Sequence, residues 1–572
     1  MDAVAETNSD RKWFWGITLI IAAILVSLPD LSAHHMFAGP DLMFHLNRIE
    51  GMKDALLAGQ FPVRINAYQL GGYGAPTDIF YPDLFLYFPA CLRLLGVSLT
   101  TSWRAFLVLV NFLTVFSCWW IFSAYTRSVR TGAIASLFYL VFAYRIVEEY
   151  VVLAAGSIVA QAFLPAACLS VWMVLRRRVS YWPAAVLFST GVLQSHIISS
   201  LLLLIAVLAM VLVSLPQFRF QEVRRAAGKA VAFIALLNLW FYAPMLYFHR
   251  HMDYVMKHVA SHDISQAIFP FFSSDFYMGS GMLLLLAAVV VRAACHWRKM
   301  PRSFWWMLFL GAAVMVLMLS PQAWRWIGKA GGVLQFTARL AVFPAFLLSM
   351  ALAMGLASMR RTWILLGLVF LCWTGNLLWL LGSDAAIPPH PRPQAMEDVE
   401  KGIFLKRTAI TNVMQEFERE TAGVGCRDYL DVGVSQRLKE ADDIREKVKD
   451  RAVRPDDRIE TVERCGTSLD VTYRAGQETW LQLPLFWYMG YAAEDQTGGT
   501  AVPMRKDEDG QVSVLLPSSA GTVHVRYAGL GWFHGTDLLS WFGWTGFLYM
   551  AYRSRPSSRK RENQWKELEE RK

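Results

Sequence analysis

Residues 41–82 read DLMFHLNRIEGMKDALLAGQFPVRINAYQLGGYGAPTDIFYP and follow the first apolar segment of the chain. The first part has helical periodicity, and a helix places Asp41, His45 and Arg48 on one face because they are four and three residues apart. The second part is rich in glycine, proline and tyrosine, which favours a folded loop. Beside a membrane span, this acid, imidazole and guanidinium indicate either a reactive site or an ion-pair network. A solvated connecting loop is the alternative.

The composition is that of a polytopic membrane protein. Of the 572 residues, 55% are hydrophobic and only 17% are charged. The net charge of +10 does not indicate nucleic-acid binding, because the basic residues form short runs between apolar segments and thus mark cytoplasmic loops. These runs are Arg127 with Arg130, Arg176 to Arg178, Arg224 with Arg225, Arg298 with Lys299, Arg360 with Arg361, and the tail from Arg553.

About twelve apolar runs approach the length of roughly 20 residues that a bilayer requires. They lie at about 13–29, 104–125, 131–147, 157–175, 181–196, 197–215, 229–245, 280–296, 303–320, 340–358, 362–382 and 535–552. The run from 181 to 215 is too long for one span, and we divide it near His196. The interrupted segment Tyr81–Val97 is expected to be re-entrant or interfacial, which leaves both termini in the cytoplasm.

This topology predicts an all-α membrane bundle over residues 1–382, with an exterior loop at 30–103. Residues 383–534 are then an exterior α+β domain, opened by a proline-rich linker. Residues 535–572 form the last span and a basic cytoplasmic tail. We expect the chain to lie in the inner (cytoplasmic) membrane.

The exterior domain is expected to begin with charged helices and to end in a small β-sandwich. Alternating patterns predict four strands at SLDVTYR, TWLQLPLF, QVSVLLP and TVHVRYAG. Cys426 and Cys465 are the two cysteines of this domain, and a disulfide between them is a candidate in an oxidising compartment.

Three segments carry a resemblance to a known family. DLMFHLNRIEGMKDALLAGQFPVRI, GGYGAP and FYPDL resemble the first exterior loop of bacterial integral membrane proteins described as 6-pyruvoyl-tetrahydropterin-synthase-related. LQFTARL, residues 334–340, is similar to a Gln-Phe-x-x-Arg motif of these proteins. FWYMGYAA and DGQVSVLLPSSAGTVHVRYAG resemble their carboxy-terminal β-domain. The chain differs from many of them at VVLAAGSIVAQAFLP, which lacks the Arg and Glu found before the equivalent of Pro165.

The resemblance places the chain with the lipoteichoic-acid-type membrane glycosyltransferases of the GT-C superfamily, and it implies no pterin chemistry. It implies transfer of a sugar from a polyprenyl-phosphate donor to an exterior glycan, lipid or protein acceptor. In GT-C enzymes the catalytic base is an acid of the first exterior loop, and Asp41 is the matching position.

The remaining candidate residues suit recognition of such a substrate. Cations near the bilayer surface can hold a lipid phosphate, and Arg339 is the strongest candidate because an arginine at the mouth of a span is costly unless it is paired. A Gly-rich loop lets the backbone approach a sugar or phosphate closely. The candidate substrate-binding residues are therefore His45, Arg48, Gly72, Tyr73, Tyr81 and Arg339.

Two further clusters have alternative interpretations. Glu148 and Glu149 are alternative bases or partners of a structural ion pair with Arg145. His251, His258 and His262 share a helix face and are candidate ligands of a divalent metal, although interfacial amphipathic histidines are the commoner explanation of such a pattern. Besides a glycosyltransferase, we considered a transporter or flippase for a lipid-linked glycan and a non-catalytic assembly protein of the envelope polysaccharide. No internal repeat supports a transporter.

Overall fold

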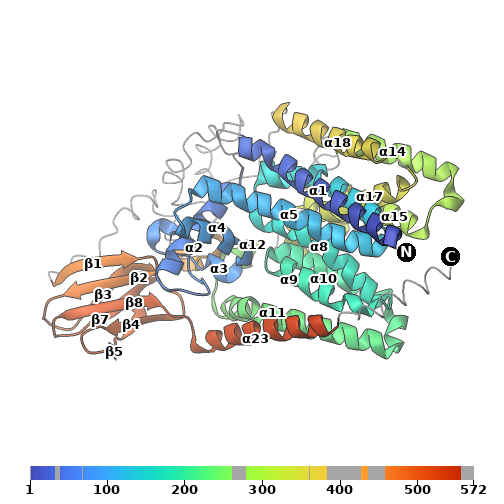
Figure 1. Ribbon diagram of the computed structural model, residues 1–572. Helices are drawn as coiled ribbons and strands as arrows, with labels where there is room; N and C mark the ends of the chain where they lie inside the picture. Colours follow the sequence, from blue (N-terminus) through green and yellow to red (C-terminus); the bar gives the residue numbers. More distant parts are fainter. Residues whose placement is uncertain are drawn as a thin grey trace.

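The computed structural model describes residues 2–32, 39–66, 68–259, 279–359, 361–382, 427–435 and 458–554. The predicted helices of the exterior domain, Cys426 and His262 lie outside these residues. Figure 1 shows a helical part and a strand-rich part, joined by the short helices of the first loop.

The helical part begins with α1 and ends with α23. Its longer helices are α1 (Asp2–Ser32), α2 (Leu42–Leu57), α5 (Leu99–Thr126), α6 (Val129–Leu140), α8 (Ala155–Leu175), α9 (Trp182–Leu193), α10 (Ile197–Leu212), α11 (Gln221–His251), α14 (Ser280–Cys295), α15 (Arg302–Leu319), α17 (Val342–Gly355), α18 (Thr362–Gly382) and α23 (Gly531–Arg553). Its shorter elements are α3 (Thr77–Phe80), α4 (Tyr87–Leu94), α7 (Ala143–Val147), the π-helical turn η3 (Glu148–Val152), α12 (Val255–Val259), α16 (Pro321–Ile327), the 3₁₀ turn η9 (Thr337–Ala341) and the 3₁₀ turn η11 (Arg427–Tyr429).

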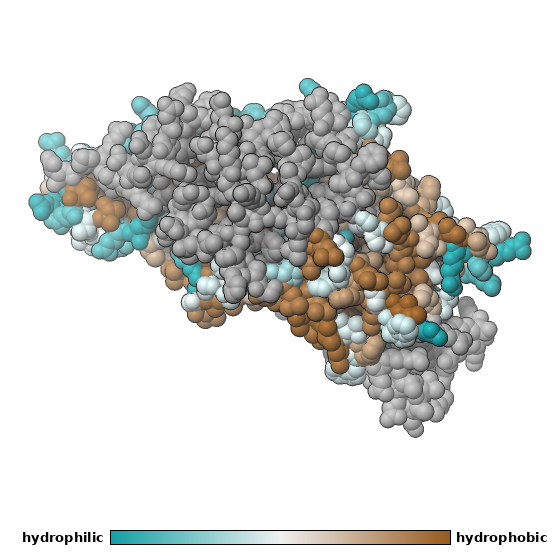
Figure 2. Space-filling model, turned by 90° about the horizontal axis from the view of Figure 1, so that it is seen from above, coloured by the Kyte–Doolittle hydropathy of each residue, from teal (hydrophilic) through white to brown (hydrophobic). Residues whose placement is uncertain are grey.

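This is a multi-pass membrane architecture. Among the described residues, six helices are long and apolar enough to cross a membrane, and seven if α6 and the following α7–η3 segment form one span bent by 47°. Five further apolar helices are shorter, so the count of twelve spans stays a prediction. Figure 2 shows hydrophobic residues gathered on the surface of the helical part, as expected of a lipid-facing surface.

One local prediction about the spans is confirmed, whereas the re-entrant or interfacial placement of Tyr81–Val97 stays a prediction. The long apolar run divides at His196, which is the N-cap residue between α9 and α10. Within Tyr81–Val97, α4 has only eight residues, or about 12 Å of helix, and is too short to cross a bilayer.

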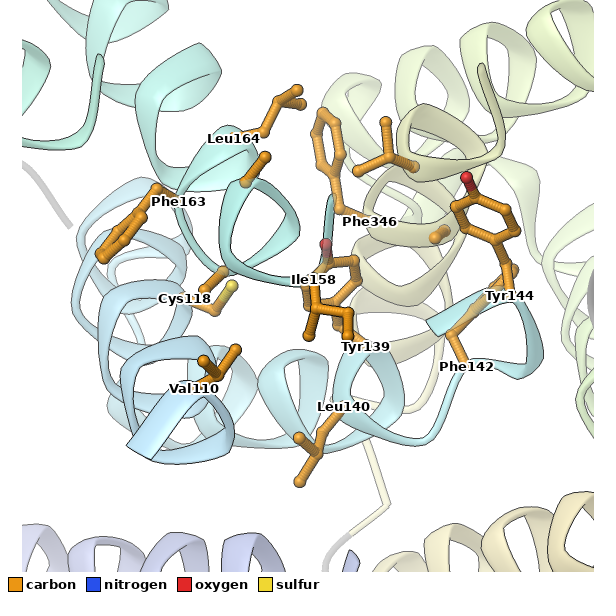
Figure 3. Packing of buried hydrophobic residues seen from close by; sticks show 14 of the residues in the cluster. Val110, Cys118, Tyr139, Leu140, Phe142, Tyr144, Ile158, Phe163, Leu164 and Phe346 are labelled. Atoms are coloured by element: carbon orange, nitrogen blue, oxygen red, sulfur yellow. The ribbon is translucent and has the colours of Figure 1, made fainter. Parts of the chain in front are cut away.

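The bundle core forms where α5, α6, α8 and α17 pack against one another. Figure 3 shows Cys118 of α5, Tyr139 of α6, Ile158 of α8 and Phe346 of α17 pointing into this core. The Tyr139 hydroxyl donates a hydrogen bond of 2.7 Å to the carbonyl oxygen of Gln161. The buried tyrosine therefore keeps a polar partner inside an apolar environment.

The strand-rich part is a sandwich of two antiparallel sheets. The five-stranded sheet has the order β1-β2-β8-β4-β5, and the three-stranded sheet has the order β3-β7-β6. Their bounds are β1 (Ile459–Cys465), β2 (Ser468–Tyr473), β3 (Thr479–Phe486), β4 (Tyr491–Asp495), β5 (Thr500–Ala501), β6 (Met504–Lys506), β7 (Gln511–Leu516) and β8 (Gly521–Tyr527). The four predicted strands are confirmed as β2, β3, β7 and β8. The sequence patterns missed the other four.

The sandwich packs on the first loop through a shared apolar cluster. This cluster joins Ile65, Tyr73 and Phe80 of the loop to residues of both sheets. Arg64 of the same loop forms a buried ion pair of 2.7 Å with Asp537 of α23. Helices α11 and α23 lie side by side along the lower edge of Figure 1. The first loop is therefore held between the sandwich and the helical bundle.

Candidate active site

Arg48 fastens the loop after α3 to helix α2. Its Nε donates to Asp78 at 3.1 Å, and its Nη2 donates to the carbonyl oxygens of Tyr81 and Pro82 at 3.0 and 3.1 Å. The guanidinium also stacks over the ring of Tyr81 at 4.5 Å. Arg48 is only 1% exposed, so these contacts account for its charge and donors. The structure therefore places it as a support of the loop.

Asp41 lies at the start of α2, in the N-cap position. Its backbone is helical there (φ −100°, ψ −5°), and in the described part of the chain its carboxylate makes no capping hydrogen bond. The usual N-cap residue has extended backbone and a side chain that accepts from the first helical turn. The carboxylate of Asp41 is therefore not engaged in the capping that explains most aspartates at this position.

The π-helical turn η3 holds Asp41 from the opposite side. The Asp41 amide donates to the carbonyl oxygen of Val152 at 3.2 Å. Gly39 allows this approach, since a Cβ atom there would lie 2.4 Å from the carbonyl oxygen of Val151. The turn itself is closed by a bond of 2.9 Å from the Leu153 amide to the carbonyl oxygen of Glu148.

Glu148 faces the same space as Asp41. It is half-buried, and its carboxylate accepts hydrogen bonds from Ser157 and Tyr144. The pKa of Asp41 is raised to about 6, first by its withdrawal from water and then by the charge of Glu148, while Arg339 opposes the shift. Asp428 of η11 adds a smaller effect that also raises the pKa. The carboxylates of Asp41, Glu148 and Asp428 and the guanidinium of Arg339 thus interact near the start of α2.

Arg339 is the cation of this cluster. It lies in η9, is half-buried, and stacks over the ring of Phe336 at 5.3 Å. Among the described residues, its guanidinium has one hydrogen bond, from Nη1 to the carbonyl oxygen of Leu334 at 3.2 Å, and no ion pair within 4.0 Å. Several of its five N–H groups therefore remain available for an anion.

Aromatic and imidazole rings line the other side of the cluster. Tyr81 is half-buried, and its hydroxyl group interacts electrostatically with Asp41, Arg339 and Glu148. The rings of His45 and His196 lie 6.0 and 5.9 Å from the Tyr81 ring. Burial and the nearby Arg48 hold the pKa of His45 well below its usual range. His45 is therefore neutral, and the cation that interacts with Asp41 is Arg339.

The glycine-rich loop lies against the sandwich. Tyr73 packs on Phe486 with a ring-centroid distance of 5.1 Å, and its carbonyl oxygen accepts from the Phe486 amide at 2.9 Å. The carbonyl oxygen of Gly72 accepts from Arg464 of β1. Gly72 and Tyr73 thus make contacts that join the loop to the sandwich, and the structure does not bring them to Asp41.

The candidate histidine ligands do not form a cluster in the described residues. The ring of His251 hydrogen-bonds the carbonyl oxygen of Tyr247 at 2.8 Å, whereas His258 pairs with Asp253 at 2.6 Å. Over the described ranges, no group of three or more His, Cys, Asp or Glu side chains could hold a metal ion.

Sequence reasoning did not identify three residues that the structure places here: His196, Asp428 and Tyr429. His196 could have been found from its position at the break of an apolar run. Tyr429 stacks on Phe80 at 5.4 Å with 7° between the ring planes, and the Val255 amide donates to the carbonyl oxygen of Leu430 at 3.1 Å. No local pattern predicts that residues 427–435 reach this site, because tertiary packing alone brings them there.

The geometry suits transfer of a group to a hydroxyl. An acid with a pKa of about 6 is a base near neutral pH and can accept the proton of an attacking hydroxyl. A guanidinium with free donors beside it can bind and neutralise an anionic leaving group.

No protein-family model matches the chain, and no curated protein matches it. The chain is similar to solved structures at low sequence identity. It resembles the arabinofuranosyltransferase AftD from Mycobacteria at 13% identity and a TM-score of 0.43, over 90% of this chain and 40% of AftD. It resembles the oligosaccharyltransferase of Archaeoglobus fulgidus at 12% identity and a TM-score of 0.37, over 73% and 61% of the two chains.

A third similarity is to ArnT from Cupriavidus metallidurans bound to undecaprenyl phosphate, at 12% identity and a TM-score of 0.37. It covers 74% of this chain and 80% of ArnT. The chain spans less than two thirds of the length of AftD and of the archaeal oligosaccharyltransferase.

Proposed function

We propose that this chain is a membrane glycosyltransferase of the GT-C type. It transfers a sugar from a polyprenyl-phosphate donor to a hydroxyl of an exterior glycan, lipid or protein acceptor. Asp41 is the general base, and Arg339 binds the donor phosphate. About twelve spans set this site at the exterior face of the inner membrane, and the sandwich lies on the same side.

One observation carries this proposal: a carboxylate and a guanidinium, each with free hydrogen-bonding capacity, lie together where the first loop meets the bundle. Arg339 makes a single hydrogen bond in the described residues, and Asp41 makes no capping bond. A buried pair that served only the fold would be fully engaged, as Arg48 is with Asp78.

The donor site can be tested by binding. Undecaprenyl phosphate is titrated onto the full-length protein in nanodiscs, with Arg339→Gln as the variant. We expect the affinity of the variant to fall about 10- to 100-fold, the range for loss of a charge-assisted hydrogen bond. Arg325→Gln is the control, because Arg325 is an exposed arginine of the preceding helix α16. Equal affinities of the wild type and Arg339→Gln would contradict the phosphate assignment.

Catalysis requires a separate measurement. A lipid-phosphate-linked sugar is supplied to cells that lack the native copy, and transfer to surface acceptors is followed. Binding of the lipid phosphate without any sugar transfer would contradict the glycosyltransferase proposal and support a carrier.

A further inference from the structure

Glu149 points into the bundle, away from its neighbour Glu148. Its Oε1 accepts from Asn111 Nδ2 of α5 at 2.6 Å, and its Oε2 lies 3.5 Å from Arg145 Nη2. Asn111 also accepts from Arg145 Nη2 at 2.7 Å and donates to Ser27 of α1 at 3.0 Å. Asn111, Arg145 and Glu149 are fully buried. We name these three residues the buried polar cluster.

The cluster connects the π-helical turn to two helices of the bundle. Glu149 belongs to η3, Arg145 belongs to α7, and the partners Asn111 and Ser27 belong to α5 and α1. The hydroxyl of the next residue, Tyr150, donates to the carbonyl oxygen of Val26 of α1. The turn is thus fixed to α1 and α5 by side chains at two consecutive positions.

The same turn carries the groups that define the site. Glu148 presents its carboxylate to Asp41, and Val152 accepts from the Asp41 amide. A π-helical turn replaces the i→i+4 bonds of an α-helix by i→i+5 bonds, here from the Leu153 amide to the carbonyl oxygen of Glu148, and the side-chain contacts of Glu149 and Tyr150 add to the bonds that hold its shape. A shift of the turn would move both acids relative to each other.

We propose that the buried polar cluster fixes η3 and thereby positions Glu148 and the proposed base Asp41. This inference rests on the proposed function for its catalytic part. The three residues touch no reacting atom and act through the turn. Burial of a charged pair contributes little net stability compared with apolar residues of similar size, which favours a positioning role over a purely stabilising one.

The test uses Asn111→Leu, which keeps the side-chain size and removes the link between α5 and the turn. Thr114→Val is the matched control, because Thr114 lies one turn along α5 and is fully buried, and in the described part of the chain its hydroxyl bonds only Val110 of its own helix. The groups that interact with Asp41 are Glu148, Arg339, Asp428 and Tyr81. Of these, only Glu148 lies on the turn.

Two readouts distinguish failure of this inference from failure of the proposed function. The first readout is the extent of carbodiimide labelling of Asp41, measured by mass spectrometry as a function of pH. It does not require an active enzyme. We expect its midpoint to fall below the wild-type value of about 6 in Asn111→Leu, because the charge of Glu148 moves away, and to stay above the ordinary aspartate value, because burial is the larger cause of the raised pKa. In the second, sugar transfer should fall about 100-fold at unchanged donor affinity, since a displacement of about 1 Å can cost that much.

If Asn111→Leu does not fold, the paired replacement Arg145→Met with Glu149→Met removes the polar link without leaving a lone buried charge, and the same shifts are expected. An unchanged labelling midpoint and an unchanged transfer rate in a folded variant would overturn the inference. A shifted midpoint in a protein that transfers no sugar would support the positioning of Asp41 and overturn only the proposed function.

Discussion

The backbone amide of Asp41 donates a hydrogen bond of 3.2 Å to the carbonyl oxygen of Val152, although the two residues are more than 100 positions apart in the chain. This bond joins the start of α2 to the π-helical turn η3. It fixes the backbone of Asp41, whose side chain makes no capping hydrogen bond within the described residues. Under the proposed function, this backbone anchor would hold the carboxylate of the base in place.

The first prediction concerns the base. Asp41→Asn keeps the side-chain shape and removes the proton acceptor, so transfer should fall about 10²- to 10⁴-fold. The protein should remain folded, because the carboxylate makes no capping bond in the described residues. Asp54→Asn is the control, since Asp54 lies on the same helix beside Lys53. An Asp41→Asn protein with wild-type glycosylation in cells would exclude Asp41 as the base and leave Glu148 as the next candidate.

The second prediction concerns pH. The base acts in its ionised form, and the pKa of Asp41 is raised to about 6. Transfer should therefore increase as the pH rises through about 6, and it should be low near pH 4. The contribution of Asp41 to folding stability changes with pH in the opposite direction. Because its pKa is higher in the folded than in the unfolded state, its stabilising contribution is present at acid pH and is lost as the pH rises through about 6.

The third prediction uses the two charges that act on Asp41 in opposite directions. Arg339→Gln removes a cation that lowers the pKa of Asp41, so the midpoint of the pH profile should move up. Glu148→Gln removes an anion that raises it, so the midpoint should move down. The measurement is the transfer rate at saturating donor across pH. Shifts of the same sign in both variants would show that the base is another group.

The fourth prediction concerns the buried pair of Arg48 and Asp78. Asp78→Ala leaves a guanidinium without its carboxylate in the interior, which should destabilise the protein by about 3–5 kcal/mol. The comparison is Glu460→Ala, which breaks an exposed ion pair with Arg474 and should change stability by about 0–1 kcal/mol. Thermal unfolding in detergent provides the measurement. Equal losses in the two variants would contradict the structural role of Arg48.

The fifth prediction concerns topology. Residues 383–534 should be exterior, and the tail after Arg553 should be cytoplasmic, because the basic runs mark the cytoplasmic side. A membrane-impermeant thiol reagent should label a cysteine placed at Asp507 and should not label one placed at Lys560. Labelling at Lys560 would reverse the side assigned to the tail and would require an odd number of spans.

The sequence by itself determined the elements whose signal is local. Hydrophobic length and the charge of short loops predict a membrane bundle, and alternating residues predict four of the eight strands. The break at His196 follows from length alone. The start of the helix at Asp41 follows from the spacing of its polar residues. These signals depend only on residues close together in the sequence, so they can be recognised without knowledge of the tertiary structure.

Only the tertiary structure decided which residues share the site. Arg48 and Arg339 are both arginines near span ends, yet Arg48 is engaged by Asp78 and two carbonyl oxygens, whereas Arg339 makes a single hydrogen bond among the described residues. Glu148 and Glu149 are adjacent, yet a helical turn directs one to Asp41 and the other to Asn111. These partners are far apart in the chain, and the packing of whole helices brings them together. The role of each charged side chain is set by the partners that packing supplies, and a single sequence does not record them.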